Sequence, residues 1–376
     1  MLKHPETLAV HAGRVVDPTT GAVTPNLTLS STFARSPDGT LPHGFNYSRN
    51  DNPNRHALET ALAGLEGGSE AAAFASGQAA TAAVLQCLPA DARVILPDDL
   101  YHGTRGLVEA FFAGRGLQAE FLDMTNAATV ARSLETPAQL VWIETPSNPR
   151  LKITDIASVA AAARKAGALV VADNTWATPL LCRPLSLGAH VVMHSTTKYL
   201  GGHSDVLGGA LVLGSDAPAD FTGRVREWQR LGGAVPAPFD CWLLQRSLAT
   251  LPLRIRAQSA TAAALAAWLA GSPRVEAVLY PGLSAHPGHA TASRQMAGPG
   301  AMISFLVRGD FAAARAVAGR LQLITRATSL GGVESMIEHR KPAEGPQSTT
   351  PDNLLRLSVG LEHVDDLRDD LQQALE

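Results

Sequence analysis

Short apolar runs alternate with segments of helical periodicity through the middle of the chain. Leu58, Leu62 and Leu65 share one helical face of a segment that starts at Arg55, and the apolar run 71–75 follows them. Later apolar runs predict strands at 93–96, 119–122, 140–143, 169–172 and 191–193. Because strands that are apolar throughout need cover on both faces, the pattern predicts an α/β fold with a mostly parallel sheet.

The pattern changes on both sides of this region. Residues 1–55 carry prolines and Gly/Ser/Asn clusters without a sustained period, which predicts an extended arm. Another strand is predicted at 206–213, and after about residue 240 we expect a helix through Trp268, strands at 302–307 and 354–359, and helices at 312–321 and 364–375. We therefore expect an arm (1–55), a larger domain (56–240) and a smaller C-terminal α/β domain (241–376).

Composition and charge exclude several classes of protein. Apolar residues make up 45% of the 376 positions and charged residues 17%, as in ordinary soluble proteins. The net charge of −3 is not accompanied by a basic tract, so we expect no nucleic-acid partner. The three cysteines are widely spaced, which argues for a reducing compartment and against a structural zinc site. Without an apolar leader or a membrane-length span, a cytoplasmic protein is expected.

The candidate chemistry lies where predicted strands end, because ligands of open α/β sheets bind beyond the carboxyl ends of the strands. Lys198 follows the apolar run 191–193 and stands near two hydroxyl residues, Ser195 and Thr197. Such an amine can hold an aldehyde cofactor as a Schiff base while the hydroxyls bind its phosphate. The alternative is an ordinary surface lysine.

Two further strand ends point to the same cofactor. Ser76, Gly77 and Gln78 open a predicted helix whose free N–H groups suit a phosphate, although a plain strand-to-helix turn is the alternative. Asp173 closes the run 169–172, where an acid needs a cation or, alternatively, caps a helix. A pyridinium nitrogen about 4 Å away would gain about 4 kcal/mol at an effective dielectric of about 20. Together these residues predict a pyridoxal 5'-phosphate site.

Several runs resemble the Cys/Met-metabolism family of pyridoxal-phosphate enzymes. The family includes cystathionine γ-synthases, γ- and β-lyases, methionine γ-lyases and O-acylhomoserine sulfhydrylases. The resemblance covers nearly the whole chain in order and is carried by residues 75–81, 144–149, 173–179, 194–209 and 329–335. It implies the fold type I of pyridoxal-phosphate transferases.

The resemblance also implies roles for individual residues. Lys198 would form the Schiff base and Asp173 would pair with the pyridine nitrogen, while Tyr101 would stack on the ring and take part in acid/base chemistry. Arg356 would clamp the substrate carboxylate. The alternation along the strand places Arg356 on the opposite face from Leu355. The alternative is an arginine on an edge strand that faces solvent. The other implied contacts are Ser76, Gly77, Gln78, Asn148, Ser195 and Thr197 for the cofactor and Ser329 for the substrate.

Two more implications concern assembly and substrate. Tyr47 and Arg49 match a motif that reaches the phosphate of a neighbouring subunit, which implies a homo-oligomer with a shared site, expected to be a tetramer. Glu334 resembles the glutamate of enzymes that act at Cγ, which favours γ-elimination or γ-replacement on a sulfur amino acid or an O-acylhomoserine. Three features depart from the family pattern and bear on the substrate: Gln78, Arg105 and the segment 337–346.

Alternative activities remain open from the sequence. Within the family these are cystathionine β-lyase, methionine γ-lyase and O-acetylhomoserine sulfhydrylase. Outside it, an aminotransferase or a cofactor-binding protein without catalysis would share the fold. A nicotinamide dehydrogenase is disfavoured because the chain has no G-x-G-x-x-G after its first predicted strands.

Overall fold

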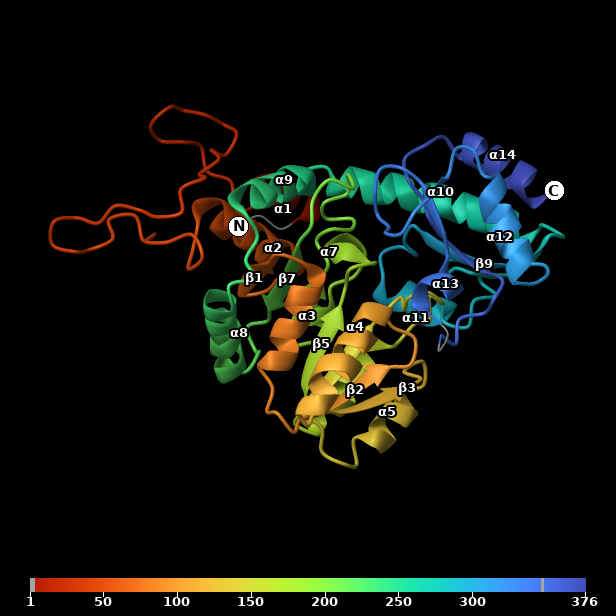
Figure 1. Cartoon of the computed structure of the whole chain (residues 1–376), viewed down its shortest axis with the longest axis horizontal. Coiled ribbons are helices and arrows are strands. Elements are labelled where there is room, and N and C mark those ends of the chain that lie inside the picture. The colour runs from red at the N-terminus through yellow and green to blue at the C-terminus, as the bar shows by residue number, and fades with distance from the viewer. Residues whose placement is uncertain (1–3, 346–347) are drawn as a thin grey trace.

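The computed structural model describes residues 4–345 and 348–376. Residues 1–3 of the predicted arm and Pro346 of the segment 337–346 lie outside this range. Two sheets with helices packed around them form the body, and a long loop region near the N-terminus extends away from it (Figure 1).

The larger sheet has seven strands in the described residues, in the order β1-β7-β6-β5-β4-β2-β3. β7 runs antiparallel to both of its neighbours, and the other pairings are parallel, as expected for a mostly parallel sheet. The strands are β1 (Glu70–Phe74), β2 (Arg93–Pro97), β3 (Gln118–Leu122), β4 (Leu140–Glu144), β5 (Leu169–Asp173), β6 (Val191–His194) and β7 (Gly209–Leu213).

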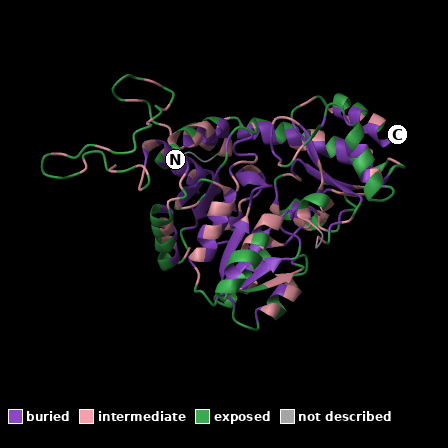
Figure 2. Ribbon diagram, viewed as in Figure 1, coloured by how far each residue is buried: buried purple, intermediate pink, exposed green. Residues whose placement is uncertain are grey.

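Alternate side chains of these strands enter two hydrophobic cores, one on each face of the sheet. Ile95 and Val170 pack on the face covered by α2 and α6, whereas Val94 and Val171 pack on the face covered by α3 and α8. Figure 2 shows the strands buried between these helices. The helices of this region are α2 (Pro53–Glu66), α3 (Gly77–Gln86), α4 (His102–Leu107), η1 (Val108–Phe112), η2 (Ala113–Arg115), α5 (Ala127–Ser133), α6 (Ile156–Lys165), α7 (Thr178–Leu181), η3 (Pro184–Leu187) and α8 (Ala219–Gly232).

The second sheet has five strands in the part of the chain that the structure describes, in the order β10-β11-β12-β9-β8. Its core face packs on the long helix α10 and on α12. The strands are β8 (Val275–Leu279), β9 (Met302–Val307), β10 (Thr325–Arg326), β11 (Met336–His339) and β12 (Leu354–Ser358). The helices are α9 (Pro238–Leu248), α10 (Leu251–Ala270), α11 (His289–Gln295), α12 (Phe311–Arg320), α13 (Arg340–Glu344) and α14 (Val364–Leu375).

Most predicted elements lie within two residues of their expected ends, with three differences. The strand expected at 206–213 begins at Gly209, because 206–208 form part of the loop beside the pocket described below. The helix expected to run through Trp268 is split into α9 and α10 at Ala249 and Thr250. The proposed boundary at residue 240 falls inside α9, and the division into domains stays a prediction.

The third difference concerns the arm. Its start contains helix α1 (Pro5–His11), whose Ala9 is buried in the main core. Beyond α1 the arm is irregular as expected, with an isolated bridge between Thr32 and Tyr47, and it projects from the body in two loops (Figure 1). Its apolar side chains are unusually open to solvent: Val15 is 77% exposed and Leu29 69%.

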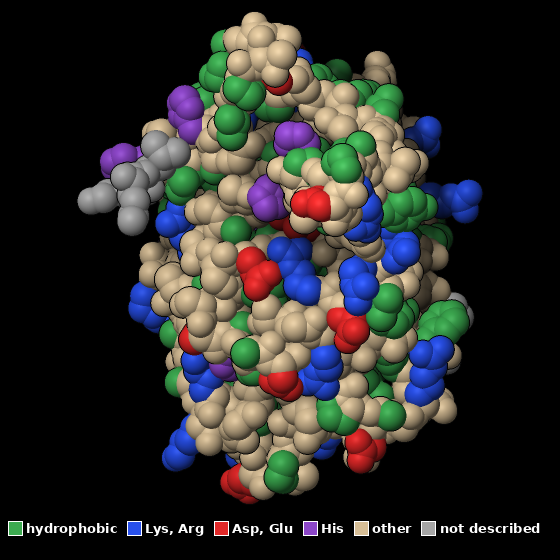
Figure 3. Space-filling view, turned by 90° about the vertical axis from the view of Figure 1, so that its left-hand side faces the viewer, with side chains coloured by type: hydrophobic (Ala, Val, Ile, Leu, Met, Phe, Trp, Pro, Cys, Tyr) green, Lys and Arg blue, Asp and Glu red, His purple; other side chains and the backbone are tan. Residues whose placement is uncertain are grey.

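Figure 3 views the molecule from the side on which the arm projects. Charged side chains of both signs are interspersed on this face. Among the described helices, none combines the length and apolarity that a membrane crossing requires.

Candidate active site

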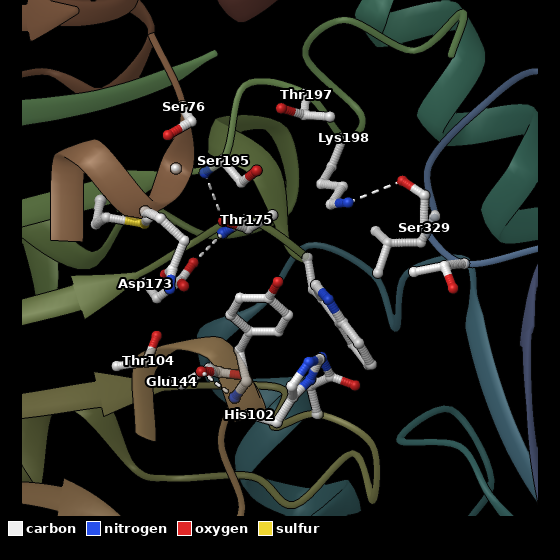
Figure 4. Close-up of a pocket in the computed structure, with 18 of the residues that line it drawn as sticks. Ser76, His102, Thr104, Glu144, Asp173, Thr175, Ser195, Thr197, Lys198 and Ser329 are labelled. Carbon is white, nitrogen blue, oxygen red and sulfur yellow. Dashed lines mark hydrogen bonds between the residues drawn. The ribbon is translucent and has the colours of Figure 1, made fainter. Parts of the chain in front are cut away.

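A cavity of about 220 Å³ lies at the carboxyl ends of the larger sheet's strands. Figure 4 shows how its walls come from distant parts of the chain, with Lys198 and Ser329 approaching each other from different ribbons. The predicted residues that line it are Ser76, Gly77, Gln78, Tyr101, Asn148, Asp173, Ser195, Thr197, Lys198, Ser329 and Arg356. The structure therefore brings together side chains that the sequence analysis selected from separate motifs.

Lys198 points into the cavity, so the alternative of an ordinary surface lysine is wrong. Its Nζ donates a hydrogen bond to Ser329 Oγ at 2.8 Å. Burial, aided by the nearby Arg356 guanidinium, lowers the pKa of Lys198 to about 8. A larger share of this amine is therefore neutral, and nucleophilic, at neutral pH than for an exposed lysine.

Ser329 holds this position in a strained backbone conformation. Its φ of 112° lies in a region that favours glycine, and such strain costs about 1–3 kcal/mol. The conformation lets the Ser329 hydroxyl meet Lys198 while its carbonyl oxygen accepts from Arg356 Nη2 at 3.1 Å. Strain at a residue that joins two charged groups is typical of a functional site.

The N-terminus of α3 forms one end of the cavity. The helix begins at Gly77, as the sequence predicted, and Ser76 caps it, its Oγ accepting from Ala79 N at 3.1 Å. A Cβ at Gly77 would lie 2.8 Å from Ser195 Cβ, and one at Gly209 only 2.2 Å from Ser76 O. Only glycine permits these approaches, which bring the free N–H groups of the helix against the Ser195 segment. This cradle suits a phosphate group.

Asp173 lies on the cavity wall at the end of β5. Its Oδ1 accepts from Thr175 N at 2.9 Å, and Thr175 Oγ1 in turn accepts from Ser195 N at 2.9 Å. Burial raises the pKa of Asp173, and the hydrogen bonds from Thr175 counter part of that rise. The next helix, α7, begins only at Thr178 with Ala177 as its N-cap, so Asp173 accepts from a turn that starts at Thr175 and does not cap a helix. A cation against this carboxylate would offset the cost of its burial.

Glu144 is a second buried carboxylate, and its role was not predicted. It is the register partner of Asp173 on the adjacent strand β4 and lines the same cavity. Its two oxygens accept from Tyr101 N at 3.0 and 2.9 Å. Burial, reinforced by the Asp173 charge, raises the pKa of Glu144 well above its usual value. The sequence did contain a signal for this role, because Glu144 and Asp173 are acids that end two parallel strands.

Arg356 lines the same cavity, beside Ser329. It is 3% exposed and belongs to β12, which lies between β11 and β9, so the edge-strand alternative is wrong. Nη1 donates to Asn148 Oδ1 at 2.9 Å, and Nη2 donates to Glu338 Oε2 at 2.8 Å. Glu338 and the cavity-lining Arg340 come from the segment 337–346, which the sequence analysis noted only as a departure from the family pattern.

Three predicted residues do not line this cavity. Glu334 lies in an adjoining groove, where its carboxylate accepts a hydrogen bond from the Ser204 hydroxyl. Tyr47 is 45% exposed, and Arg49 donates to the carbonyl oxygen of Arg230. A single chain therefore does not bring the arm motif to the phosphate cradle.

The cavity fits pyridoxal 5'-phosphate. The Lys198 amine can bind the aldehyde, the cradle around Gly77 can bind the phosphate, and Asp173 can face the ring nitrogen. Because burial favours the protonated form of Glu144, this side chain adds less negative charge beside Asp173 than an exposed glutamate would.

Comparisons with known proteins agree with pyridoxal 5'-phosphate as the cofactor. The family model of "Cys/Met metabolism PLP-dependent enzyme" matches residues 6–376. Cystathionine gamma-synthase of Mycobacterium tuberculosis is 46% identical over 99% of this chain and 96% of its own length, and cystathionine beta-lyase of Coxiella burnetii is 42% identical over 99% and 98%. The crystal structure of cystathionine gamma synthase from Xanthomonas oryzae in complex with aminoacrylate and cysteine superposes with a TM-score of 0.95 at 41% identity, covering 100% of this chain and 98% of that one. The chain therefore belongs to the family of Cys/Met-metabolism enzymes that depend on pyridoxal 5'-phosphate.

Proposed function

We propose that this enzyme catalyses γ-elimination or γ-replacement on a sulfur amino acid or an O-acylhomoserine, as cystathionine γ-synthases and γ-lyases do. The observation that carries the proposal is that Ser329 hydrogen-bonds both Lys198 and Arg356. A reactive amine and a carboxylate-binding guanidinium thus flank one residue, and an α-amino acid needs both kinds of group beside it.

The protein side chains divide the work of the reaction. Pyridoxal phosphate, when bound, supplies an electron sink for negative charge at the substrate's Cα. Asp173 would hold the ring nitrogen, and Asn148 would contact the cofactor as well. The phosphate would be held by the cradle of Ser76, Gly77, Gln78, Ser195 and Thr197. Arg356 would bind the substrate carboxylate, and Lys198 would move protons at the substrate's Cα and Cβ. Tyr101, which lines the same cavity, would cover the ring and protonate the departing group.

The preference for Cγ is supported by the relatives and by one motif. The Mycobacterium tuberculosis protein, named a gamma-synthase, is 46% identical, and Glu334 resembles the glutamate of Cγ-specific enzymes. Glu334 lines the adjoining groove, which shares Thr197 and Ser329 with the main cavity. Glu334 would therefore contact the part of a long substrate that extends from the cavity into this groove. Cystathionine β-lyase is the second candidate, because the Coxiella burnetii relative carries that name at 42% identity.

We further propose a cytoplasmic homo-oligomer, expected to be a tetramer, in which each site is completed by a neighbour's arm. The exposed Tyr47 and Arg49 on a projecting arm support the shared site. Three buried, unpaired cysteines support a reducing compartment.

Product analysis tests the activity. Cystathionine, O-succinylhomoserine, O-acetylhomoserine and methionine are each incubated with the holoenzyme, with and without cysteine or sulfide. We expect 2-oxobutyrate from elimination and a new thioether when a thiol is added. Pyruvate as the sole keto product would overturn Cγ chemistry in favour of a β-lyase, and the Lys198→Ala protein serves as the inactive control.

A further inference from the structure

Glu338 and Arg356 form a buried ion pair at the substrate end of the cavity. They are register partners on the antiparallel strands β11 and β12, so their side chains stand on the same face. Glu338 Oε2 accepts from Arg356 Nη2 at 2.8 Å. An internal carboxylate therefore already occupies the guanidinium proposed to receive the substrate's carboxylate.

The donors of Arg356 show why this matters. A guanidinium offers five N–H groups, and a carboxylate binds it bidentately through Nη2 together with either Nη1 or Nε. The two Nη2 hydrogens go to Glu338 Oε2 and to the Ser329 carbonyl oxygen, while Nε is buried without a partner in the described residues. Bidentate binding of a substrate carboxylate requires one of these two acceptors to release Nη2.

Glu338 is the acceptor that can leave. The Ser329 carbonyl is fixed in the backbone, whereas the Glu338 carboxylate already has other partners. Its Oε2 also accepts from Arg340 Nη1 at 2.6 Å, and its Oε1 accepts from Thr328 Oγ1 at 2.8 Å. Release of Arg356 would therefore leave Glu338 paired with a cation and hydrogen-bonded through both oxygens.

Arg340 is itself held firmly for this task. It is 1% exposed, its Nε donates to Glu344 Oε1 at 3.1 Å, and its Nη2 lies 3.2 Å from His102 Nδ1. Although burial opposes it, the guanidinium groups of Arg356 and Arg340 lower the pKa of Glu338 overall. Glu338 is therefore a charged competitor at neutral pH.

We propose that Glu338 competes with the substrate's α-carboxylate for Arg356 and sets the enzyme's affinity for amino acids, with Arg340 and Thr328 holding Glu338 once the substrate has bound. Glu338 and Arg340 are thus positioning residues that act through Arg356. The inference rests on the proposed role of Arg356 as the carboxylate anchor.

Binding of glycine to the holoenzyme, followed through the visible absorption of the cofactor, tests the proposal. Glu338→Gln removes the competing charge but keeps the shape, so the Kd for glycine should fall roughly three- to tenfold. Arg340→Gln removes the cation that draws Glu338 away, so the Kd should rise by a similar factor. If Glu338 merely orients Arg356, both substitutions would weaken binding, which would overturn the proposal.

Two controls separate the possible failures. Ethylamine, which lacks a carboxylate, should react equally well with all variants, and a change in its Kd matching that for glycine would overturn the assignment to carboxylate binding. Arg356→Lys should weaken glycine binding; an unchanged Kd there would refute the anchor itself rather than the competition. Thr328→Val, a milder change than Arg340→Gln, should also raise the Kd and covers the case in which the arginine variant does not fold.

Discussion

Lys198 Nζ and Ser329 Oγ are 131 residues apart in sequence and 2.8 Å apart in space. The contact places the amine in a buried position beside the Arg356 guanidinium, and these surroundings lower the pKa of Lys198 to about 8. Capture of pyridoxal phosphate by the apoprotein requires the neutral amine. The capture rate should therefore rise with pH through about 8 and level off above it, as measured by stopped-flow absorbance. A rate that continues to rise towards the ordinary lysine pKa of 10.5 would contradict this assignment.

The same shift has a consequence for stability. The folded apoprotein gives up the Lys198 proton near pH 8, whereas the unfolded chain keeps it up to about 10.5. The unfolded state binds more protons in this window, so stability rises with pH through it, and the full cost applies below pH 8. Lys198→Met should stabilise the apoprotein at pH 7 by about 3 kcal/mol.

Urea unfolding of the two apoproteins at pH 7 and above pH 10.5 checks this expectation. The advantage of the methionine variant should shrink at high pH, where the wild-type amine is neutral in both states. An advantage independent of pH would indicate that better apolar packing, and not charge, is responsible.

Glu144 should behave as a neutral acid that positions Tyr101. Its raised pKa means that the folded state keeps a proton that the unfolded state loses above about 4.5, so stability falls as pH rises through that window. Glu144→Gln keeps an acceptor for Tyr101 N and should remove this decline with little loss of kcat. Glu144→Ala leaves the N–H of Tyr101 unpaired and should cost about 1–3 kcal/mol in urea unfolding. Equal loss of activity in both variants would instead assign Glu144 a direct ionised role.

Gly209 should be essential to the phosphate cradle. A Cβ there would lie 2.2 Å from Ser76 O and 2.8 Å from Gly77 N, both backbone atoms at the start of α3. Gly209→Ala should therefore displace the helix, cost about 1–3 kcal/mol of stability and weaken binding of pyridoxal phosphate at least tenfold. Gly223→Ala in α8 is the matched control, since no atom lies within 4 Å of its added Cβ. The control should be stabilised by up to about 1 kcal/mol. Unchanged cofactor affinity in the Gly209 variant would show that the cradle can shift without harm.

The sequence predicted most of the larger sheet because most of its strands are rich in apolar residues, and the ends of several carry unusual residues. Lys198, Asp173 and the Ser76 turn were found at such strand ends, where the chain itself places them at one edge of the sheet. Gly209 marks the limit of this reasoning. The apolar run 206–213 starts three residues before β7, and only the close approach of Gly209 to Ser76 shows where the strand begins.

The substrate end was less predictable, because it depends on how two sheets meet. The alternation of polar and apolar residues along β12 placed Arg356 and Leu355 on opposite faces of the strand. It does not reveal that β12 lies in the interior of the sheet. Glu338 meets Arg356 through strand register, and Arg340 of α13 meets Glu338; nothing local in the sequence encodes that register. The role of Glu144 was missed for a related reason, since its environment is set by Asp173 on the next strand.

Mixing two inactive variants should reveal the shared site. The exposed arm places Arg49 at the carbonyl of Arg230, away from the cavity of its own chain, so its proposed phosphate contact must be made in a partner. In a mixed dimer of Arg49→Ala and Lys198→Ala chains, one site receives an intact lysine from the first chain and an intact arginine from the second. When equal amounts of the two chains assemble at random, about half of the dimers are mixed, and each mixed dimer has one intact site out of two. The mixture should therefore recover about a quarter of wild-type activity.

The matched control pairs the Arg49→Ala chain with a chain carrying both substitutions. That mixture lacks any site with an intact arginine and lysine, so its activity should stay at the level of the Arg49→Ala protein alone. Both mixtures are unfolded and refolded together, and native mass spectrometry measures the fraction of mixed dimers. If the first mixture stays inactive while mixed dimers are abundant, Arg49 does not act across the interface, and the arm must serve the site of its own chain or none. Activity restored equally in both mixtures would instead show that Arg49 is dispensable for cofactor binding.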